Sequence, residues 1–377
     1  MARKKRYNVA VVGATGAVGT EMLRVLEARR FPVGKIRLLA SERSEGRRLS
    51  FNGSLYRVEP LDTRAFDEID LALFSAGAIR ALEFAPEALR RGAIVVDNSS
   101  AFRLENDVPL IVPEVNPHAL DRHHGLIANP NCSAIIMLVA LKPLHDAARI
   151  TRIRVSTYQS VSGAGARAMW QLYEETKHAL RQFEVRSSKF EVHPKLRTSR
   201  FKLPTGLPQQ IAFNLIPQVD VFLENRYTRE EMKLVHETRK ILEEPRLPIS
   251  ATCVRVPVFV AHSEAIWIET ERSLSANEAR RILQRAPGVR VIDEPSRQAY
   301  PMPLDAAGRD EVFVGRIRAD LSAPMPARPE ESRAGGSKGQ AGESVRNGLA
   351  LWVSGDNLRK GAATNAVQIA ELVIGKR

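Results

Sequence analysis

Cysteine is scarce in this chain, which has only Cys132 and Cys253 among its 377 residues. Two cysteines cannot form the disulfide framework of a small secreted domain, so a reducing, cytoplasmic setting is the simplest expectation. Long hydrophobic runs are also lacking. No apolar stretch approaches the roughly 20 residues that a membrane-spanning helix needs, so no membrane association is expected. The basic N-terminus leads into the short apolar run 9–12 and then into glycines, which indicates a first strand and no signal peptide.

Acidic residues are fewer than basic ones. The chain has 43 Asp and Glu and 56 Lys and Arg, so its formal net charge is +13. Such a charge raises the question of nucleic-acid binding. The basic residues are scattered along the chain, however, and no basic block is interleaved with aromatic residues. No nucleic-acid partner is therefore expected. A positive field suits acidic substrates and a phosphorylated cofactor equally well.

The length suits two domains, because 377 residues exceed what one hydrophobic core usually holds. The first third of the chain alternates strand-like and helix-like segments. Short apolar runs that indicate buried strands occupy residues 7–12, 36–40, 71–75 and 94–96. This alternation predicts βαβ units and a parallel sheet, as in the Rossmann-type α/β fold.

The pattern changes near residue 150. Strand-like runs then occupy residues 153–160, 251–260, 265–269 and 312–317, and helical stretches occupy residues 166–182 and 229–243. We expect a second, mixed α/β domain with a large sheet, and a last helix, residues 357–373, that packs back on the first domain. Residues 324–347 are rich in Pro, Gly, Ser and charge, so they should form a flexible surface loop.

Glycines mark the turn after the first predicted strand, where Gly13, Gly16 and Gly19 lie in the run 13–19. Glycine lets the backbone approach a pyrophosphate, and the N-terminus of the following helix supplies N–H donors and a partial positive charge. The spacing is Gly-x-x-Gly-x-x-Gly and not the standard Gly-x-Gly-x-x-Gly, so a purely structural turn is the alternative. Its place directly after a strand favours a dinucleotide site.

The segment after the second predicted strand bears on the choice of cofactor. An acidic residue there suits a free 2′-hydroxyl, whereas arginine and hydroxyls suit a 2′-phosphate. Arg43 and Ser44 favour NADP, but Glu42 and Glu45 leave a solvated charged loop as the alternative. We predict NADP as the cofactor.

Cys132 follows Asn129, Pro130 and Asn131 and precedes the apolar run 134–139. It should therefore lie where a loop meets the start of a buried helix. A helix N-terminus lowers the pKa of a thiol and favours the nucleophilic thiolate. A buried, inert cysteine is the alternative, and position alone does not decide between the two.

Three polar residues farther along add to this pattern. Gln159 enters a loop of small residues, 160–165, at the end of a predicted strand. Arg255 is a charge among apolar strand residues, so it needs a partner, either a bound carboxylate or a local acidic side chain. Strict strand alternation would put Arg255 and His262 on opposite faces, so both face one site only if the chain bends between them.

Taken together, these residues resemble the aspartate-semialdehyde dehydrogenase family along nearly the whole chain. The matching stretches, in chain order, are residues 13–19, 95–103, 129–133, 156–165, 212–218, 227–241, 255–264 and 356–363. So many matches in order make coincidence implausible. The resemblance implies NADPH-dependent reduction of L-aspartyl 4-phosphate to L-aspartate 4-semialdehyde and phosphate, in the biosynthesis of lysine and diaminopimelate, threonine, methionine and isoleucine.

The resemblance also implies a domain organisation. A Rossmann-type NADP-binding domain would span residues 1–131, completed by the C-terminal helix at about 356–377. A mixed α+β catalytic and dimerisation domain, similar to the C-terminal domain of glyceraldehyde-3-phosphate dehydrogenase, would span residues 132–355. Small-molecule substrates and a homodimer or homotetramer are expected. One departure is the segment 324–347, which is longer than the family's usual join at this place.

A role for each matching residue follows from the resemblance. Cys132 would attack the acyl phosphate and form a thioester, and His262 would be the acid–base group. Gln159 would orient the substrate, and Arg255 would hold its α-carboxylate. The remaining implied ligands are Glu230 and Asn131 for the substrate, Arg103 and Lys233 for the phosphate, and Gly13, Thr15, Gly16, Ala17, Val18, Arg43, Ser44, Ser162, Gly163 and Asn357 for the cofactor. No metal is expected. Without the resemblance, Glu230 and Lys233 would be interpreted as a surface ion pair.

Two rival functions stand beside this one. A neighbouring acyl-phosphate reductase, such as the one acting on N-acetylglutamyl phosphate, shares the dinucleotide turn, a cysteine and a histidine. Arg255 with Glu230 and Lys233 instead favours a free amino acid, whose amine stays charged. The other rival is a catalytically silent paralogue. The joint presence of four residues argues against it: Cys132, His262, Gln159 and Arg255.

Overall fold

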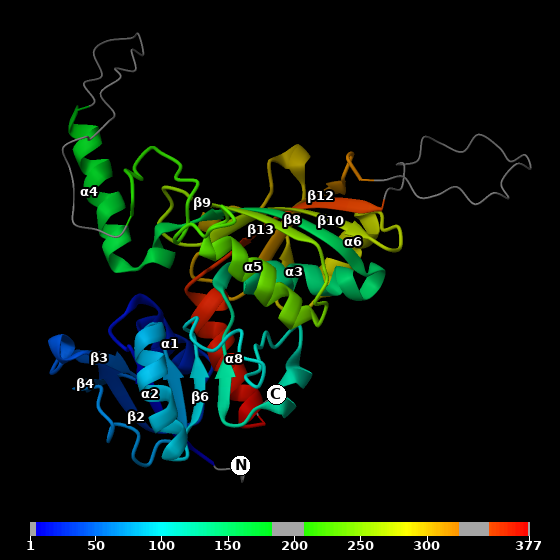
Figure 1. Cartoon of the computed structure of the whole chain (residues 1–377). Coiled ribbons are helices and arrows are strands. Elements are labelled where there is room, and N and C mark those ends of the chain that lie inside the picture. The colour runs from blue at the N-terminus through cyan, green and yellow to red at the C-terminus, as the bar shows by residue number, and fades with distance from the viewer. Residues whose placement is uncertain (1–4, 183–206, 324–346, 376–377) are drawn as a thin grey trace, which may run out of the picture.

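The structure of the chain is a computed structural model that describes residues 5–182, 207–323 and 347–375. Within these ranges the strands form two sheets. A seven-stranded sheet comprises, in spatial order, β3 (Arg48–Phe51), β4 (Ser54–Pro60), β2 (Val33–Ala40), β1 (Tyr7–Val12), β5 (Leu71–Phe74), β6 (Ile94–Asp97) and β7 (Leu126–Ala128). A six-stranded sheet comprises β11 (Val289–Val291), β12 (Val312–Ala319), β13 (Gly348–Gly355), β10 (His262–Thr270), β8 (Ile150–Gln159) and β9 (Ile249–Arg255). Figure 1 shows the first sheet at the bottom and the second sheet above it.

The first sheet is parallel from β2 through β1, β5 and β6 to β7, as the alternating pattern predicts. The edge strand β3 is the exception, because it pairs antiparallel with β4. A two-residue turn joins them, and both of its residues, Asn52 and Gly53, have positive φ. An Asn-Gly pair suits the type I′ hairpin turn, which matches the twist of the flanking strands. The predicted parallel sheet therefore carries one antiparallel strand at this edge.

Helices cover both faces of the first sheet. α1 (Ala17–Ala28) and α8 (Thr364–Val373) pack on one face with Val9 and Val11, while α2 (Ala78–Arg90) packs on the other face with Ala10 and Val12. Because both faces are covered, β1 is apolar at consecutive positions and shows no alternation. The chain thus returns to the first sheet through α8 after the second sheet is complete (Figure 1).

The second sheet is covered by helices on the face that looks toward the first sheet. These helices are α3 (Cys132–Ala148), α5 (Arg229–Leu242) and α6 (Ala276–Gln284) (Figure 1). α3 is buried at every position from Ala134 to Leu141, as expected for a helix that is apolar all round. The remaining helices are α4 (Ala166–Gln182), α7 (Pro303–Ala306), the short 3-10 helices η1 (Glu42–Ser44), η2 (Pro117–Arg122), η3 (Val161–Ala164) and η4 (Pro295–Arg297), and the π-helix η5 (Arg359–Ala363).

The strand predicted at residues 251–260 ends early. β9 stops at Arg255, and β10 begins at His262 after a turn in which Ala261 has a φ of +74°. β8 lies between the two strands, parallel to β9 and antiparallel to β10. Gln159, Arg255 and His262 therefore meet at one end of the sheet, and the bend that the alternation argument requires is present.

A buried lysine ties the C-terminal segment to the first sheet. The Lys360 ammonium is 1% exposed and donates to Glu114 Oε2 at 2.5 Å, to Gln368 Oε1 at 2.7 Å and to Asn365 Oδ1 at 2.9 Å. Asn365 in turn donates to Asn129 Oδ1 at 2.7 Å. These bonds connect the π-helix to the turn that precedes Cys132. The helix predicted at 357–373 is thus divided into η5 and α8.

The flexible loop predicted at residues 324–347 lies outside the described residues, except for Asn347, whose carbonyl accepts the Thr270 N–H. In the parts of the chain that the structure describes, no helix combines the length and the apolar character needed to cross a membrane.

Replacing Lys360 with methionine should lower the free energy of unfolding by about 3–5 kcal/mol, because Glu114 would keep a buried charge without its cation. Lys35 is the matched control, since its ion pair with Glu68 leaves both side chains more than two-thirds exposed. Lys35→Met should change the stability by less than about 1 kcal/mol. Urea unfolding followed by circular dichroism measures both. Equal effects of the two substitutions would contradict the structural role of Lys360.

Candidate active site

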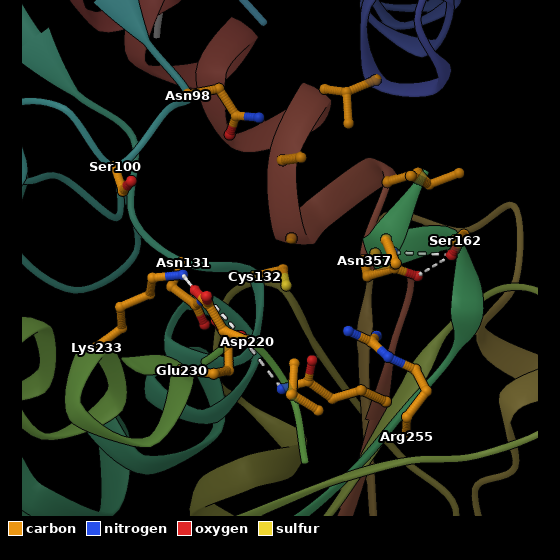
Figure 2. Close-up of a pocket in the computed structure, with 18 of the residues that line it drawn as sticks. Asn98, Ser100, Asn131, Cys132, Ser162, Asp220, Glu230, Lys233, Arg255 and Asn357 are labelled. Carbon is orange, nitrogen blue, oxygen red and sulfur yellow. Dashed lines mark hydrogen bonds and ion pairs between the residues drawn. The ribbon is translucent and has the colours of Figure 1, made fainter. Parts of the chain in front are cut away.

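A cavity of about 770 Å³ lies where the carboxyl ends of strands in both sheets face one another. Ligands bind at this edge in open α/β sheets. The cavity brings together most of the predicted substrate and cofactor residues from distant parts of the chain (Figure 2). Those that line it are Val18, Arg103, Asn131, Cys132, Gln159, Ser162, Gly163, Glu230, Lys233, Arg255 and Asn357.

Cys132 is the first residue of α3, as predicted, and Asn131 caps that helix. The Asn131 Oδ1 accepts the N–H groups of Ser133 at 3.0 Å and Ala134 at 3.2 Å. Desolvation by the surrounding protein, helped by the Glu230 carboxylate, raises the pKa of the Cys132 thiol to about 12, although Arg103 and Arg255 oppose this. The lowering expected from the helix N-terminus is thus outweighed, and the thiol is protonated at neutral pH.

Glu230 is the centre of the substrate side of the cavity. Its Oε1 accepts the side-chain amides of Asn131 at 2.8 Å and Gln159 at 3.3 Å, and its Oε2 accepts the Lys233 ammonium at 3.1 Å. Burial favours a higher pKa for Glu230, but Lys233 and the two amides hold it below its ordinary value. Lys233 also donates to Asp220 Oδ2 at 2.9 Å, so this ammonium lies between two carboxylates (Figure 2).

Arg255 is buried and has no ion-pair partner among the residues that the structure describes. Its Nη1 donates to the Ser160 carbonyl at 2.7 Å, and its Nε has no hydrogen-bond partner. Among the described residues no carboxylate lies within ion-pair distance of this guanidinium, which removes the local acidic side chain as the alternative. A buried guanidinium with free donors is suited to hold a ligand carboxylate.

His262 lies directly behind the cavity wall and is fully buried. Its Nδ1 faces the Ser160 N–H at 3.1 Å and the Ser160 hydroxyl at 3.0 Å, while Nε2 has no partner. A Cβ added to Gly163 would lie 3.3 Å from Nε2, so only a glycine separates the ring from the cavity. Burial and the nearby Arg255 lower the pKa of His262 to about 3, which keeps the imidazole neutral.

Asn357 orders the loops around His262. Its Nδ2 donates to Ser162 Oγ at 2.9 Å (Figure 2). Its Oδ1 accepts the Ala261 N–H at 3.0 Å and the Ser160 hydroxyl at 3.1 Å. One residue near the end of the chain therefore holds the loop after β8 and the bend before β10 together.

The glycine turn has the geometry that a dinucleotide site needs. Gly13 has a φ of +86°, and a Cβ there would lie 2.6 Å from the Ser75 carbonyl oxygen. Gly16 is the N-cap of α1 and offers no side-chain acceptor, so N–H donors at the start of α1 are free for a phosphate. The turn and the loop after β2 meet where Thr15 donates to Ser44 Oγ at 3.3 Å. These residues fit a bound NADP, with Arg43 exposed beside them.

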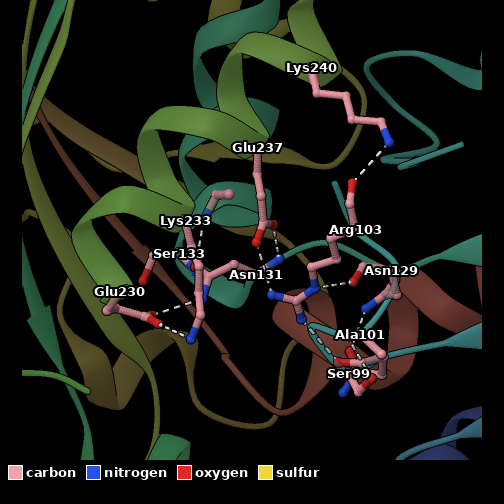
Figure 3. Close-up of polar contacts among 12 residues, drawn as sticks. Ser99, Ala101, Arg103, Asn129, Asn131, Ser133, Glu230, Lys233, Glu237 and Lys240 are labelled. Carbon is pink, nitrogen blue, oxygen red and sulfur yellow. Dashed lines mark hydrogen bonds and ion pairs between the residues drawn. The ribbon is translucent and has the colours of Figure 1, made fainter. Parts of the chain in front are cut away.

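Arg103 is buried at the cavity edge, and its guanidinium is held by protein groups. Its Nη1 pairs with Glu237 Oε1 at 3.0 Å, its Nε donates to the Asn129 carbonyl at 2.9 Å, and its Nη2 donates to the Asn98 carbonyl at 3.0 Å (Figure 3). Glu237 and Asp220 also belong to this site, and neither was predicted from the sequence. A signal for Glu237 existed, because it lies two helical turns after Glu230 and so on the same face of α5.

Comparisons with known proteins agree with this geometry. Residues 8–123 match a family model described as semialdehyde dehydrogenase, NAD binding domain, and residues 141–326 match semialdehyde dehydrogenase, dimerisation domain. Relatives named aspartate-semialdehyde dehydrogenase include one from Aquifex aeolicus, 50% identical over 98% of both chains, and one from Bacillus subtilis, 46% identical over 97% of this chain and 96% of the other.

Solved structures give the same result. The crystal structure of aspartate semialdehyde dehydrogenase II from Vibrio cholerae has a TM-score of 0.83 and 44% identity, covering 98% of this chain and 99% of that one. The same enzyme complexed with ASA has a TM-score of 0.83 and 43% identity, covering 99% of each chain. The chain belongs to the aspartate-semialdehyde dehydrogenase family.

Proposed function

We propose that the chain reduces L-aspartyl 4-phosphate to L-aspartate 4-semialdehyde and phosphate, with Cys132 as the nucleophile and NADP as the cofactor. The observation that carries this proposal is the convergence of Cys132, a free buried guanidinium and a buried carboxylate in one cavity beside a dinucleotide turn. Attack by the Cys132 sulfur on the acyl carbon forms a thioester and releases phosphate. NADPH, when bound, supplies the hydride that reduces the thioester.

The charges in the cavity complement those of aspartyl phosphate. Arg255 is available for the α-carboxylate, and Glu230 is available for the α-ammonium group. Arg103 and Lys233 line the same cavity and would hold the phosphate. An N-acetylated substrate has no ammonium group, so the buried Glu230 carboxylate would gain no partner from it. This disfavours an N-acetylglutamyl-phosphate reductase.

Ser160 prepares His262 for acid–base work. The backbone N–H of Ser160 donates to Nδ1 and so stabilises the tautomer with the proton on Nε2, whereas the Ser160 hydroxyl can either donate to Nδ1 or accept a hydrogen bond from Nδ1–H. For Nε2 to take the thiol proton of Cys132, the ring proton must first move to Nδ1, where the Ser160 hydroxyl accepts its hydrogen bond and the Ser160 N–H loses its acceptor. Nε2 can then return the proton to the reaction. The negative charges of the substrate would favour this transfer, because they stabilise an imidazolium that burial otherwise disfavours.

We infer the oligomeric state and the cellular location from the family to which the chain belongs. The dimerisation-domain match supports a dimer, and we propose a homodimer or a tetramer built from two dimers. The division into domains at residue 132 and a cytoplasmic location are proposals too. The two free cysteines of the described chain support a reducing setting.

The reverse reaction tests the nucleophile. Aspartate semialdehyde, phosphate and NADP should yield NADPH in a phosphate-dependent manner, followed by absorbance. Cys132→Ser should lower this rate by at least about a thousandfold, since a hydroxyl is a far weaker nucleophile near neutral pH. Cys253→Ala is the control, because this cysteine is fully buried and is absent from the cavity lining. Full turnover by Cys132→Ser would refute the thioester.

Alkylation by iodoacetamide tests the electrostatics around Cys132. Glu230→Gln removes a negative charge that raises the thiol pKa, so it should speed modification at pH 7. Arg255→Gln removes a positive charge that lowers the pKa, so it should slow modification. Each unit of pKa change corresponds to about a tenfold change in thiolate. Cys132→Ser supplies the background rate. Rates that move in the same direction in both variants would contradict this assignment.

Cofactor choice can be tested at the loop after β2. Arg43→Ala should raise KM for NADP about tenfold and leave KM for NAD nearly unchanged, because only NADP carries the 2′-phosphate. Arg47→Ala, in the same loop and also exposed, is the matched control. The role of Arg43 would be ruled out if the parent enzyme used NAD as well as NADP and Arg43→Ala left KM for both cofactors unchanged.

A further inference from the structure

One face of α5 extends beyond the cavity toward the first sheet. Glu230 and Lys233 line the cavity, whereas Glu237 and Lys240, one and two turns farther along, are absent from its lining. All four residues lie on the same side of the helix at spacings of three, four and three residues. Figure 3 shows Glu237 pointing to Arg103 and Asn131, and Lys240 pointing to the loop that carries Arg103.

Glu237 joins two separate parts of the site. One carboxylate oxygen accepts Arg103 Nη1 at 3.0 Å, and the other accepts the backbone N–H of Asn131 at 2.6 Å. Glu237 is 1% exposed, so these bonds form in a low-dielectric environment where their loss is costly. The residue therefore fixes the distance between the Arg103 guanidinium and the turn that leads into Cys132.

Lys240 holds the same arginine at its other end. Its ammonium donates to the carbonyl oxygens of Arg103 at 2.9 Å, Glu105 at 2.6 Å and Val108 at 2.8 Å. An ammonium has three donors, so all of them are used. Arg103 is thus held by its backbone through Lys240 and by its guanidinium through Glu237.

The bonds to Arg103 leave a defined set of donors. A guanidinium has five N–H groups. Three of them are used within the protein: the Nε–H by the Asn129 carbonyl, one N–H of Nη1 by Glu237, and one N–H of Nη2 by the Asn98 carbonyl. One N–H on each Nη nitrogen remains to donate to the oxygens of a phosphate.

Arg103 and α5 come from different parts of the molecule. Arg103 follows β6 of the first sheet, inside the region that matches the NAD-binding domain model, whereas α5 packs on the second sheet. We propose that Glu237 and Lys240 are positioning residues that hold the phosphate-binding Arg103 of the first domain against the Cys132 turn of the second. This inference rests on the proposed role of Arg103 in binding the phosphate. Neither residue touches the substrate, and both act through Arg103.

Steady-state kinetics of the reverse reaction, with phosphate varied, test the proposal. Glu237→Gln keeps the shape of the side chain but has one acceptor oxygen in place of two. The Arg103 guanidinium and the Asn131 backbone N–H each need an acceptor here, so one of them loses its hydrogen bond. KM for phosphate should rise about tenfold or more. KM for the semialdehyde and the dissociation constant of NADP, from fluorescence titration, should stay within about twofold. Glu83→Gln, which disrupts an exposed pair with Arg80, is the control.

Lys240→Met provides a second variant that keeps the aliphatic stem and removes three bonds. It should also raise KM for phosphate selectively. If Glu237→Gln fails to fold, this variant alone tests whether the positioning of Arg103 affects phosphate binding. Its control is Lys142→Met. Among the described ion pairs, the Lys142 ammonium pairs only with Asp146, one turn along α3. In an Arg103→Ala background, Glu237→Gln should change KM for phosphate by no more than about twofold, because its effect passes through Arg103.

Three results would count against the proposal. KM for phosphate within twofold of the parent in folded variants would remove the positioning role. Parallel losses in every kinetic constant together with a lower melting temperature would show a merely structural role. Full additivity of Glu237→Gln and Arg103→Ala would show that Glu237 does not act through the arginine. If the parent itself has no phosphate-dependent turnover, the proposed function fails, which is a separate result.

Discussion

The short turn before α3 is the point on which the active site depends, because it sets where Cys132 lies. The turn is held from several directions. Asn129 receives hydrogen bonds from Arg103 on its carbonyl and from Asn365 on its side chain, and Asn131 is bound by Glu237 on its backbone and by Glu230 on its side chain. A turn bound only by water would leave the nucleophile free to move. Both sheets and the C-terminal helix therefore contribute to one position.

Burial explains why these contacts are charged and paired. Arg103 lies against Glu237, and Lys233 lies between Glu230 and Asp220, so each buried charge has a partner that offsets part of its desolvation. Arg255 differs, since its hydrogen bond among the described residues goes to the Ser160 carbonyl and not to a carboxylate. The same desolvation raises the pKa of the Cys132 thiol and lowers the pKa of the His262 imidazole, so both groups are neutral at neutral pH.

Local patterns were sufficient to predict many of the strands, the glycine turn and the place of Cys132 at a helix start, because these features depend on neighbouring residues. Most of the other residues that line the cavity, Glu230 and Lys233 among them, were expected only from the family resemblance. The β3–β4 hairpin was missed although Asn52-Gly53 is a strong turn signal. Other features depend on distant parts of the chain. The bend between Arg255 and His262 is stabilised when Asn357 accepts the Ala261 N–H, a contact across 96 residues. Glu237 meets Arg103 across 134 residues, and no periodicity in either segment indicates that partner. The roles of the individual site residues stay predictions.

The return of the chain end to the first sheet has a consequence for the chemistry. Gly361, in the π-helix that precedes α8, lies so close to the nucleophile that an added Cβ would be 3.0 Å from the Cys132 Cβ. A π-helix is rare and is found mostly at functional sites, and here the buried Lys360 anchors it to Glu114. A hydride donor bound at the glycine turn and an acceptor held on Cys132 must lie at a short, fixed separation. Because α8 packs on the first sheet while Gly361 lies against the start of α3, this segment relates the cofactor site to the nucleophile.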